Sequence, residues 1–243
     1  MMRRRALGSL AVAGLGLVAG PACAGGLSRA AGPAGAPAIV PAPSPAVKPP
    51  ITYVALGASD AAGVGVDQPD RDGWVPVLTR LLPQPARLVN LGIPGIKLHE
   101  AIEVELTPAL EVQPSLITIW LVVNDLLGGV PLPQYAADLD RLLRELRAST
   151  RAAIAVGNVP DAPEQSRYLG MAAAERRQIA GLWNETIAAT VRVHQVMLVD
   201  LFARWPVPQH PEYIGPDGLH PTVPGYRALA DTFLTVLREQ HVV

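Results

Sequence analysis

Cysteine is almost absent from this sequence, which has 243 residues and a single cysteine, Cys23. One cysteine cannot form an intramolecular disulfide, so a framework of disulfide bonds is excluded. The histidines and Cys23 also lack the spacing of a zinc site. The sequence therefore predicts neither disulfide cross-links nor a bound metal.

Aromatic residues and net charge are also scarce. Aromatic residues make up 5% of the chain, and the formal net charge is −1 at pH 7. A surface that binds nucleic acid needs an excess of positive charge and often aromatic rings on which bases stack. We therefore expect no nucleic-acid partner. The hydrophobic content of 49% instead fits one medium-sized domain with additional segments.

The first 24 residues have the pattern of an export signal. Three consecutive arginines at residues 3–5 form a basic start, residues 6–20 are uncharged and apolar, and "ACA" at residues 22–24 offers a small-x-small cleavage motif. We interpret residues 1–24 as a signal peptide and expect a protein that is secreted or held in the cell envelope. Two alternatives stay open. In the first, lipidation of Cys23 would tether the protein to a membrane. In the second, the apolar stretch would stay uncleaved as a membrane anchor, since about 20 apolar residues can span a bilayer.

Residues 25–50 consist mostly of Ala, Gly, Pro and Ser. A segment of this composition cannot bury a hydrophobic core, and its prolines favour extended conformations. We predict that residues 25–50 are a linker and that one folded domain spans residues 51–243.

From residue 51 onwards, short apolar runs alternate with amphipathic stretches. The runs with strand character are "ITYVALG", "ARLVNLG", "SLITIWLVV", "AAIAVGNV" and "VMLVDLF". The stretches with helical periodicity are Trp74–Leu82, Leu98–Leu110, Gln134–Ala148, Met171–Val193 and Gly225–Gln240. Strands that are apolar on both faces and separated by helices indicate a parallel sheet covered on both sides. The predicted fold class is therefore a three-layer α/β/α domain.

In such sheets, ligands bind beyond the carboxyl ends of the strands, so the residues after each predicted strand are candidates for a site. "GASD" with Ser59 follows the first strand, "NLGIPG" with Gly92 the second and "VVND" with Asn124 the third. "PDGLHPT", with Asp217 and His220, stands just before the last predicted helix. We expect these five residues to meet at one edge of the sheet.

These are the residue types that acyl transfer requires. A serine hydroxyl such as that of Ser59 is a weak nucleophile until a base takes its proton, and His220 is the candidate base because imidazole titrates near neutral pH. A carboxylate such as that of Asp217 would fix the tautomer and orientation of the ring. The candidate oxyanion-hole donors are the N–H groups of Ser59 and Gly92 and the side-chain amide of Asn124. Each motif alone is more simply a turn or a helix cap, but their joint occurrence favours a catalytic set.

In their order and placement, the four motifs resemble those of the SGNH, or GDSL-type, hydrolases. That family is named for a Ser, a Gly, an Asn and a His, which match Ser59, Gly92, Asn124 and His220, and the acidic partner matches Asp217. The resemblance covers the whole predicted domain. It implies a flavodoxin-like sandwich with a five-stranded parallel sheet, and hydrolysis of esters or related acyl groups without a metal or organic cofactor.

The sequence departs from the family pattern at two positions. Ala58 stands where the family usually has an aspartate, and Asp60 follows the serine instead. We expect Asp60 to cap the following turn, because aspartate side chains bond nearby backbone N–H groups. Val122 stands where the family usually has a glycine before the Asn-Asp pair. This valine could narrow the substrate pocket or shift Asn124.

We therefore predict a serine esterase that acts on a small-molecule, lipid or saccharide ester and is a monomer. Two alternatives remain. One is a carbohydrate O-deacetylase, which would act on acetylated sugars and only weakly on free lipid esters. The other is a noncatalytic surface binding module that has kept the fold, since a fold alone does not determine function.

Overall fold

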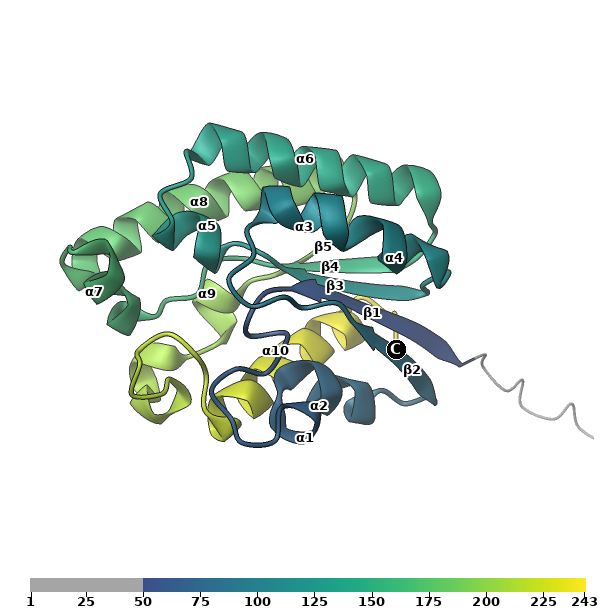
Figure 1. Cartoon of the computed structure of the whole chain (residues 1–243), viewed down its shortest axis with the longest axis horizontal. Coiled ribbons are helices and arrows are strands. Elements are labelled where there is room, and N and C mark those ends of the chain that lie inside the picture. The colour runs from purple at the N-terminus through teal and green to yellow at the C-terminus, as the bar shows by residue number, and fades with distance from the viewer. Residues whose placement is uncertain (1–49) are drawn as a thin grey trace, which may run out of the picture. The chain divides into compact units, whose positions relative to one another are not determined.

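The computed structural model describes residues 50–243, which form a five-stranded parallel sheet with helices on both faces (Figure 1). The strand order is β2-β1-β3-β4-β5. The strands are β1 (Ile51–Gly57), β2 (Ala86–Asn90), β3 (Leu116–Trp120), β4 (Ala153–Gly157) and β5 (Met197–Val199). This order is the flavodoxin-like one, which confirms the predicted fold class. The predicted signal peptide, Cys23 and the predicted linker up to residue 49 lie outside the described residues.

The two central strands β1 and β3 are buried on both faces. Every side chain of β3 is buried, and so are all but one of those of β1. Val54 of β1 lies opposite Val89 of β2 and Ile117 of β3 in parallel register. The sequences of such strands are almost continuously apolar, because helices cover both faces of the sheet.

Helices cover the two faces of the sheet (Figure 1). One face carries α1 (Pro69–Asp72), α2 (Trp74–Leu81) and α10 (Val223–Glu239), and the other carries α3 (Leu98–Val104), α4 (Leu106–Glu111), α6 (Leu132–Ser149) and α8 (Ala173–Val193). Aromatic pairs join helices on each face. Trp74 of α2 stacks on Phe233 of α10 with ring centroids 4.5 Å apart. Tyr135 of α6 lies 4.8 Å from Trp183 of α8.

The connections at the two edges of the sheet differ in length. The segments that lead into strands β2 to β5 are short, at residues 82–85, 112–115, 150–152 and 194–196. The segments that follow the strands carry the remaining short helices, which are α5 (Val123–Leu127), η1 (Pro163–Gln165), α7 (Ser166–Leu169), α9 (Leu201–Arg204), η2 (Val207–Gln209) and η3 (Pro211–Tyr213). Loops at the carboxyl ends of parallel strands are where a site is built.

One predicted helix is wrong in its length. The stretch Leu98–Leu110 forms two helices, α3 and α4, which meet at Glu105. The physical reason is Pro108, which has no N–H to donate and whose ring clashes with the carbonyl four residues earlier, at Val104. The break turns the side chain of Glu105 into the core, where the residue is 1% exposed.

Within residues 50–243, no helix combines the length and the apolar character that crossing a bilayer requires.

Candidate active site

Ser59 lies two residues after the end of β1, in a tight turn. The N–H groups of residues 62–64 donate to the carbonyl oxygens of residues 58–60 and close this turn. The residue is 7% exposed. Within residues 50–243, no acceptor binds the N–H of Ser59, as is usual for the first N–H groups of a helical turn. The strand end thus holds a hydroxyl and a free backbone donor side by side.

Asp217 and His220 lie in a short hairpin just before α10. Ile214 and Pro221 form an antiparallel bridge, and the N–H of Gly215 donates to the carbonyl of His220 at 2.8 Å. Thr222 follows directly and caps α10, since its hydroxyl accepts from the N–H of Gly225. The hairpin is therefore anchored at the start of a long helix that packs on the sheet.

A continuous chain of hydrogen bonds joins Asp217, His220 and Ser59. The imidazole Nε2 of His220 lies 3.0 Å from the Oγ of Ser59, and Nδ1 lies 2.7 Å from the Oδ2 of Asp217. The structure thus brings together three residues that the sequence places up to 161 positions apart. Nucleophile, base and orienting carboxylate stand within hydrogen-bond reach of one another, as general-base activation of a serine requires.

The environment of Asp217 keeps its carboxylate ionised. Partial burial by itself raises the pKa of Asp217, but hydrogen bonds from the N–H of Leu219, from the ring of His220 and from the N–H of His220 lower the pKa below its usual value. Oδ1 takes the two backbone N–H groups, at 2.9 and 3.1 Å. Oδ2 is thereby left for the imidazole, so the carboxylate is held in one orientation.

The loop after Ser59 packs directly behind His220. Gly65 has φ +101°, and a Cβ there would lie 3.0 Å from the Cβ of His220 and 2.9 Å from the carbonyl of Pro221. The buried Tyr226 of α10 donates its hydroxyl to the carbonyl of Val64 at 2.6 Å. The loop that carries the serine and the hairpin that carries the histidine are therefore braced against each other.

Gly92 lies against the turn of Ser59. A Cβ on Gly92 would lie 2.9 Å from the N of Ala62 and 3.0 Å from the carbonyl of Ala58, so only glycine allows this approach. Its N–H donates to the Oδ1 of Asn90 at 3.2 Å, and the amide of Asn90 donates in turn to the carbonyl of Ala61. Asn90 therefore ties the loop of Gly92 to the serine turn.

Asn124 and Asp125 stand at the start of α5 and bind the same neighbouring loop. The side-chain amide of Asn124 donates to the carbonyl of Ile96 at 2.8 Å, which occupies one of its two hydrogens. The carboxylate of Asp125 accepts from the N–H of Leu98 through both oxygens. Val122, just before them, is buried in the core. The loop of Gly92 is thus fixed on one side by Asn90 and on the other by Asn124 and Asp125.

Asp60, next to the serine, does not cap the turn as expected. Within residues 50–243, the one backbone N–H that acts on its carboxyl is its own. Burial raises the pKa of Asp60 to about 7, and the nearby His220 and its own N–H offset this only in part. The carboxyl group next to the serine in the chain thus has a pKa near neutrality, unlike that of Asp217.

Three residues that sequence reasoning did not single out are tied to the site. Glu105 accepts from the N–H of Gly57 at 3.1 Å, and burial raises the pKa of its carboxyl to about 8. Arg167 and Tyr168 donate to the backbone on either side of Asp217. The sequence marks only the helix break, through Pro108, and no local pattern indicates that Glu105, Arg167 or Tyr168 would contact the site.

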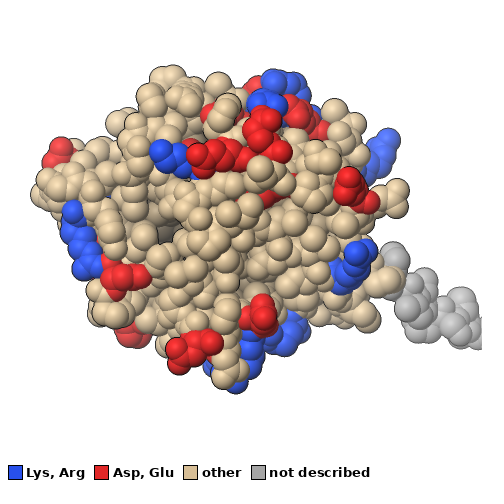
Figure 2. Space-filling view, viewed as in Figure 1, with Lys and Arg blue, Asp and Glu red and all other residues tan. Residues whose placement is uncertain are grey.

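The face shown in Figure 2 is hollowed at the edge where the strands end, between α5 and the loop of residues 205–222. The surface around the mouth of the hollow is mostly uncharged (Figure 2). Within residues 50–243, no three His, Cys, Asp or Glu side chains are grouped so that they could hold a metal ion. Of the five residues expected at this edge, Ser59, His220 and Asp217 are joined by hydrogen bonds. Gly92 lies against the turn of Ser59, and Asn124 bonds the loop that follows Gly92.

Comparison with known proteins gives a family and a fold. Residues 55–228 match the model of the GDSL-like Lipase/Acylhydrolase family. No curated protein matches the sequence at a significant level.

Several solved structures are similar to this one. TesA is 24% identical with a TM-score of 0.65, over 77% of this chain and 98% of that chain. The psychrotrophic esterase EstA from Pseudoalteromonas sp. is 21% identical with a TM-score of 0.63, over 79% and 100% of the two chains. A catalytic mutant of Axe2, an acetylxylan esterase from Geobacillus stearothermophilus, is 19% identical with a TM-score of 0.64, over 77% and 94%. At these identities the similarity establishes a shared fold.

Proposed function

The chain belongs to the GDSL-like lipase/acylhydrolase family of hydrolases, and we propose that it cleaves carboxylic esters with Ser59 as the nucleophile. One observation carries this proposal, namely the hydrogen-bond chain from Asp217 through His220 to Ser59. It supplies a base for the serine hydroxyl and a carboxylate that stabilises the imidazolium formed when the base takes the proton.

In the first half of the proposed reaction, Nε2 of His220 takes the proton of Ser59 as Oγ attacks the ester carbonyl. The oxyanion of the tetrahedral intermediate is held by the N–H of Ser59, the N–H of Gly92 and the free amide hydrogen of Asn124. The N–H of Gly92 bonds Asn90 only at 3.2 Å and can be shared with the oxyanion. The bond to the alcohol oxygen then breaks, and His220 gives its proton to the leaving alkoxide.

In the second half, water hydrolyses the acyl-serine. His220 takes a proton from the water as its oxygen attacks the acyl carbon, and the same donors hold the second oxyanion. The bond to Oγ breaks, Ser59 regains its proton from His220, and the carboxylic acid leaves. The residues end the cycle in the state in which they began it.

The N-terminal pattern supports an extracytoplasmic place of action, either secreted or held in the envelope, with Cys23 as a candidate point of lipidation. We propose that the enzyme works there as a monomer on esters of small molecules, lipids or saccharides. Fractionation of cells that express the full chain, with and without Cys23→Ala, tests the location, because a lipid-held protein moves from the membrane to the soluble fraction when the cysteine is lost.

A second candidate function is carbohydrate O-deacetylation. The observation that favours it is the similarity to Axe2, an acetylxylan esterase. A deacetylase would release acetate from acetylated sugars and would act weakly on longer acyl esters. Initial rates on acetylated xylooligosaccharides and on p-nitrophenyl esters from acetate to palmitate separate the two functions.

The esterase proposal is tested by turnover together with labelling of the serine. The purified protein is expected to hydrolyse a p-nitrophenyl ester and to react with a fluorophosphonate probe. The Ser59→Ala variant is expected to lose both activities while it keeps its circular dichroism spectrum. Undiminished turnover in folded Ser59→Ala would refute the assignment of the nucleophile. A folded wild-type protein that neither turns over esters nor reacts with the probe would instead indicate a noncatalytic binding module.

A further inference from the structure

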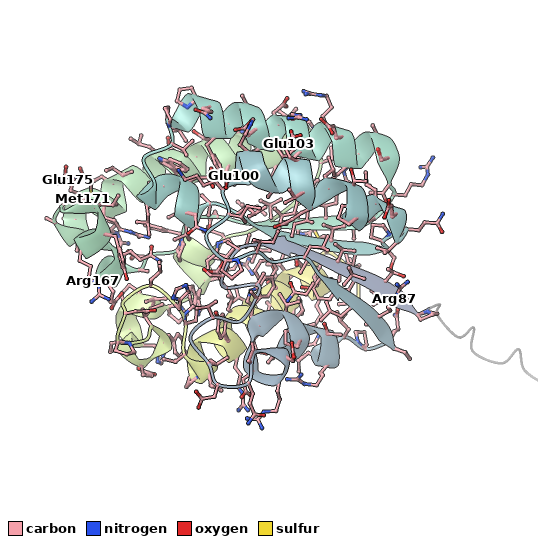
Figure 3. All side chains as sticks on the ribbon, viewed as in Figure 1. Arg87, Glu100, Glu103, Arg167, Met171 and Glu175 are labelled. Atoms are coloured by element: carbon pink, nitrogen blue, oxygen red, sulfur yellow. The ribbon has the colours of Figure 1, made fainter. Side chains whose placement is uncertain are left out.

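The segment between β4 and α8, residues 158–172, runs from the edge of the sheet to the loop of residues 205–222 (Figure 1). It contains the short helices η1 and α7. The α7 end of this segment reaches the hairpin that carries Asp217. Figure 3 shows Arg167 on the side of α7 that faces that hairpin.

Two consecutive side chains of α7 bind the backbone around Asp217. The hydroxyl of Tyr168 donates to the carbonyl of Asp217 itself at 2.6 Å. The guanidinium of Arg167 donates through Nη2 to the carbonyl of Pro216 at 3.3 Å. The Cζ of Arg167 also lies 5.3 Å from the centre of the Tyr168 ring, a cation–π distance that links the two side chains. Both donors therefore act on one peptide segment from one direction.

The turn at Gly218 leaves room for the guanidinium of Arg167. Gly218 has φ +68°, and a Cβ there would lie 2.5 Å from Nη2 and 2.6 Å from Cζ of Arg167. Glycine is thus needed at this position both for the backbone conformation and for the close approach of the arginine. Gly218 is buried although Asp217 beside it is exposed, so the arginine covers a turn that would otherwise stand open to solvent.

The segment that carries α7 is itself fixed to the body of the domain. Arg176 of α8 is fully buried. Its Nη1 donates to the carbonyl of Pro160 at 2.7 Å, and its Nη2 donates to the Oε1 of Gln165 at the start of α7. Arg177 pairs with Asp161 in the same segment. These contacts tie the segment that carries α7 to α8.

We propose that Arg167 and Tyr168 are positioning residues for the acid–base pair. They hold the backbone carbonyls of Pro216 and Asp217, and so they keep the carboxylate of Asp217 directed at Nδ1 of His220. Neither residue exchanges a proton with the substrate. This inference rests on the proposed function insofar as it concerns catalysis, but the effect on the Asp217–His220 hydrogen bond exists whether or not the protein turns over esters.

The test compares Tyr168→Phe with Tyr213→Phe in the full chain. Tyr213 lies in the loop of residues 205–222, where its ring stacks on that of His210 and does not bond Asp217, so it is a matched control. The two readouts are steady-state kinetics and the NMR signal of the histidine proton shared between Nδ1 of His220 and Asp217. The control variant Tyr213→Phe is expected to match the wild type in both.

Tyr168→Phe is expected to lower kcat about fivefold with KM unchanged, since a neutral hydrogen bond contributes about 1 kcal/mol. The shared proton is expected to exchange faster with water and its signal to broaden. Arg167→Met is expected to have the same two effects. A melting temperature within the range of the control variant shows that the fold is intact.

The outcomes separate the two proposals. If the wild type hydrolyses esters and Tyr168→Phe matches Tyr213→Phe in kcat and in the proton signal, the positioning role is overturned while the esterase proposal stands. If the wild type neither hydrolyses esters nor reacts with a fluorophosphonate, the esterase proposal fails. In that case the proton signal alone decides, since broadening in Tyr168→Phe supports positioning and an unchanged signal overturns it.

Discussion

The adjacent polar residues Asn124 and Asp125, at the edge of the sheet, have different roles. Both stand at the start of α5, and both bind the loop of residues 92–98. Asp125 is 2% exposed and commits both carboxylate oxygens to one backbone N–H. Asn124 keeps one amide hydrogen free for a ligand. Asp125 therefore has a structural role, whereas Asn124 is available for chemistry.

At the residue scale, Asn124→Ala is expected to lower kcat by about 100- to 1000-fold, as loss of one oxyanion-hole donor typically does. Initial rates on the best p-nitrophenyl ester measure this effect. Asn184→Ala is the matched control, because Asn184 also bonds a loop backbone, at Val159, but lies on α8. The control should lose stability while keeping kcat. A loss below tenfold in Asn124→Ala would show that Val122 has displaced the amide from the oxyanion.

At the scale of elements, the break between α3 and α4 serves the end of β1. Glu105 stands at the break and accepts from the N–H of Gly57, two residues before Ser59. The other oxygen of Glu105, Oε1, is buried without a hydrogen-bond partner within residues 50–243. Burial of this kind favours the protonated carboxyl, which agrees with the raised pKa of about 8. The position of the serine turn is thus coupled to a buried acid at the break between two helices.

This coupling predicts a pH dependence of stability. Between about pH 4.5 and pH 8 the unfolded chain ionises Glu105 while the folded protein keeps it protonated, so the free energy of unfolding decreases as pH rises. Glu105→Gln keeps an acceptor for Gly57 and removes the titration. Urea unfolding measures the free energy of unfolding at each pH. From pH 5 to pH 8, the value for the variant relative to that for the wild type should increase by at least about 1 kcal/mol, since one pKa unit corresponds to about 1.4 kcal/mol.

The control for this prediction is Glu103→Gln in α3, two residues before Glu105. Glu103 lies at the surface (Figure 3). It pairs with Arg141, and exposed pairs contribute little to stability. The difference between this variant and the wild type should stay nearly constant from pH 5 to pH 8. Parallel pH profiles for Glu105→Gln and the wild type would mean that Glu105 is ionised in the folded protein.

On the scale of the whole molecule, stability and chemistry are carried by different parts. The core lies between the sheet and the two helix layers, and the site lies in the loops at one edge. Phe233 of α10 is fully buried and stacks on Trp74 of α2. Gly157, at the end of β4, lies under the same ring, since a Cβ there would be 3.3 Å from its Cζ. This contact holds a helix layer to the sheet without reaching the serine.

Phe233→Ala is therefore expected to reduce the free energy of unfolding by about 3–5 kcal/mol through loss of burial and creation of a cavity. Its kcat per active serine should match that of the wild type. Urea unfolding measures the first quantity, and turnover normalised to fluorophosphonate labelling measures the second. A fall in kcat per labelled serine larger than about threefold would show that the packing of α10 also sets the geometry of the hairpin ahead of it.

Much of the fold and part of the site were predictable because their signals are local. Strand β1 was predicted with its observed limits, since its apolar run stops where Ala58 and Ser59 begin the turn. The other strands are shorter than predicted, because an apolar run does not mark where ladder pairing stops. The error at Leu98–Leu110 has a different origin, since the helical periodicity continued through Pro108, whose ring and missing N–H break the helix.

By itself, the sequence determined the parallel α/β class and the order of motifs that places Ser59, Asp217 and His220 at one edge of the sheet. Apolar periodicity and short motifs carry this information within a few residues. Only the tertiary structure decided which side chains support that set. The contacts of Glu105 with Gly57 and of Tyr168 with Asp217 span 48 and 49 positions in the chain. Such pairs depend on how packed layers bring distant loops together, and no local pattern encodes that.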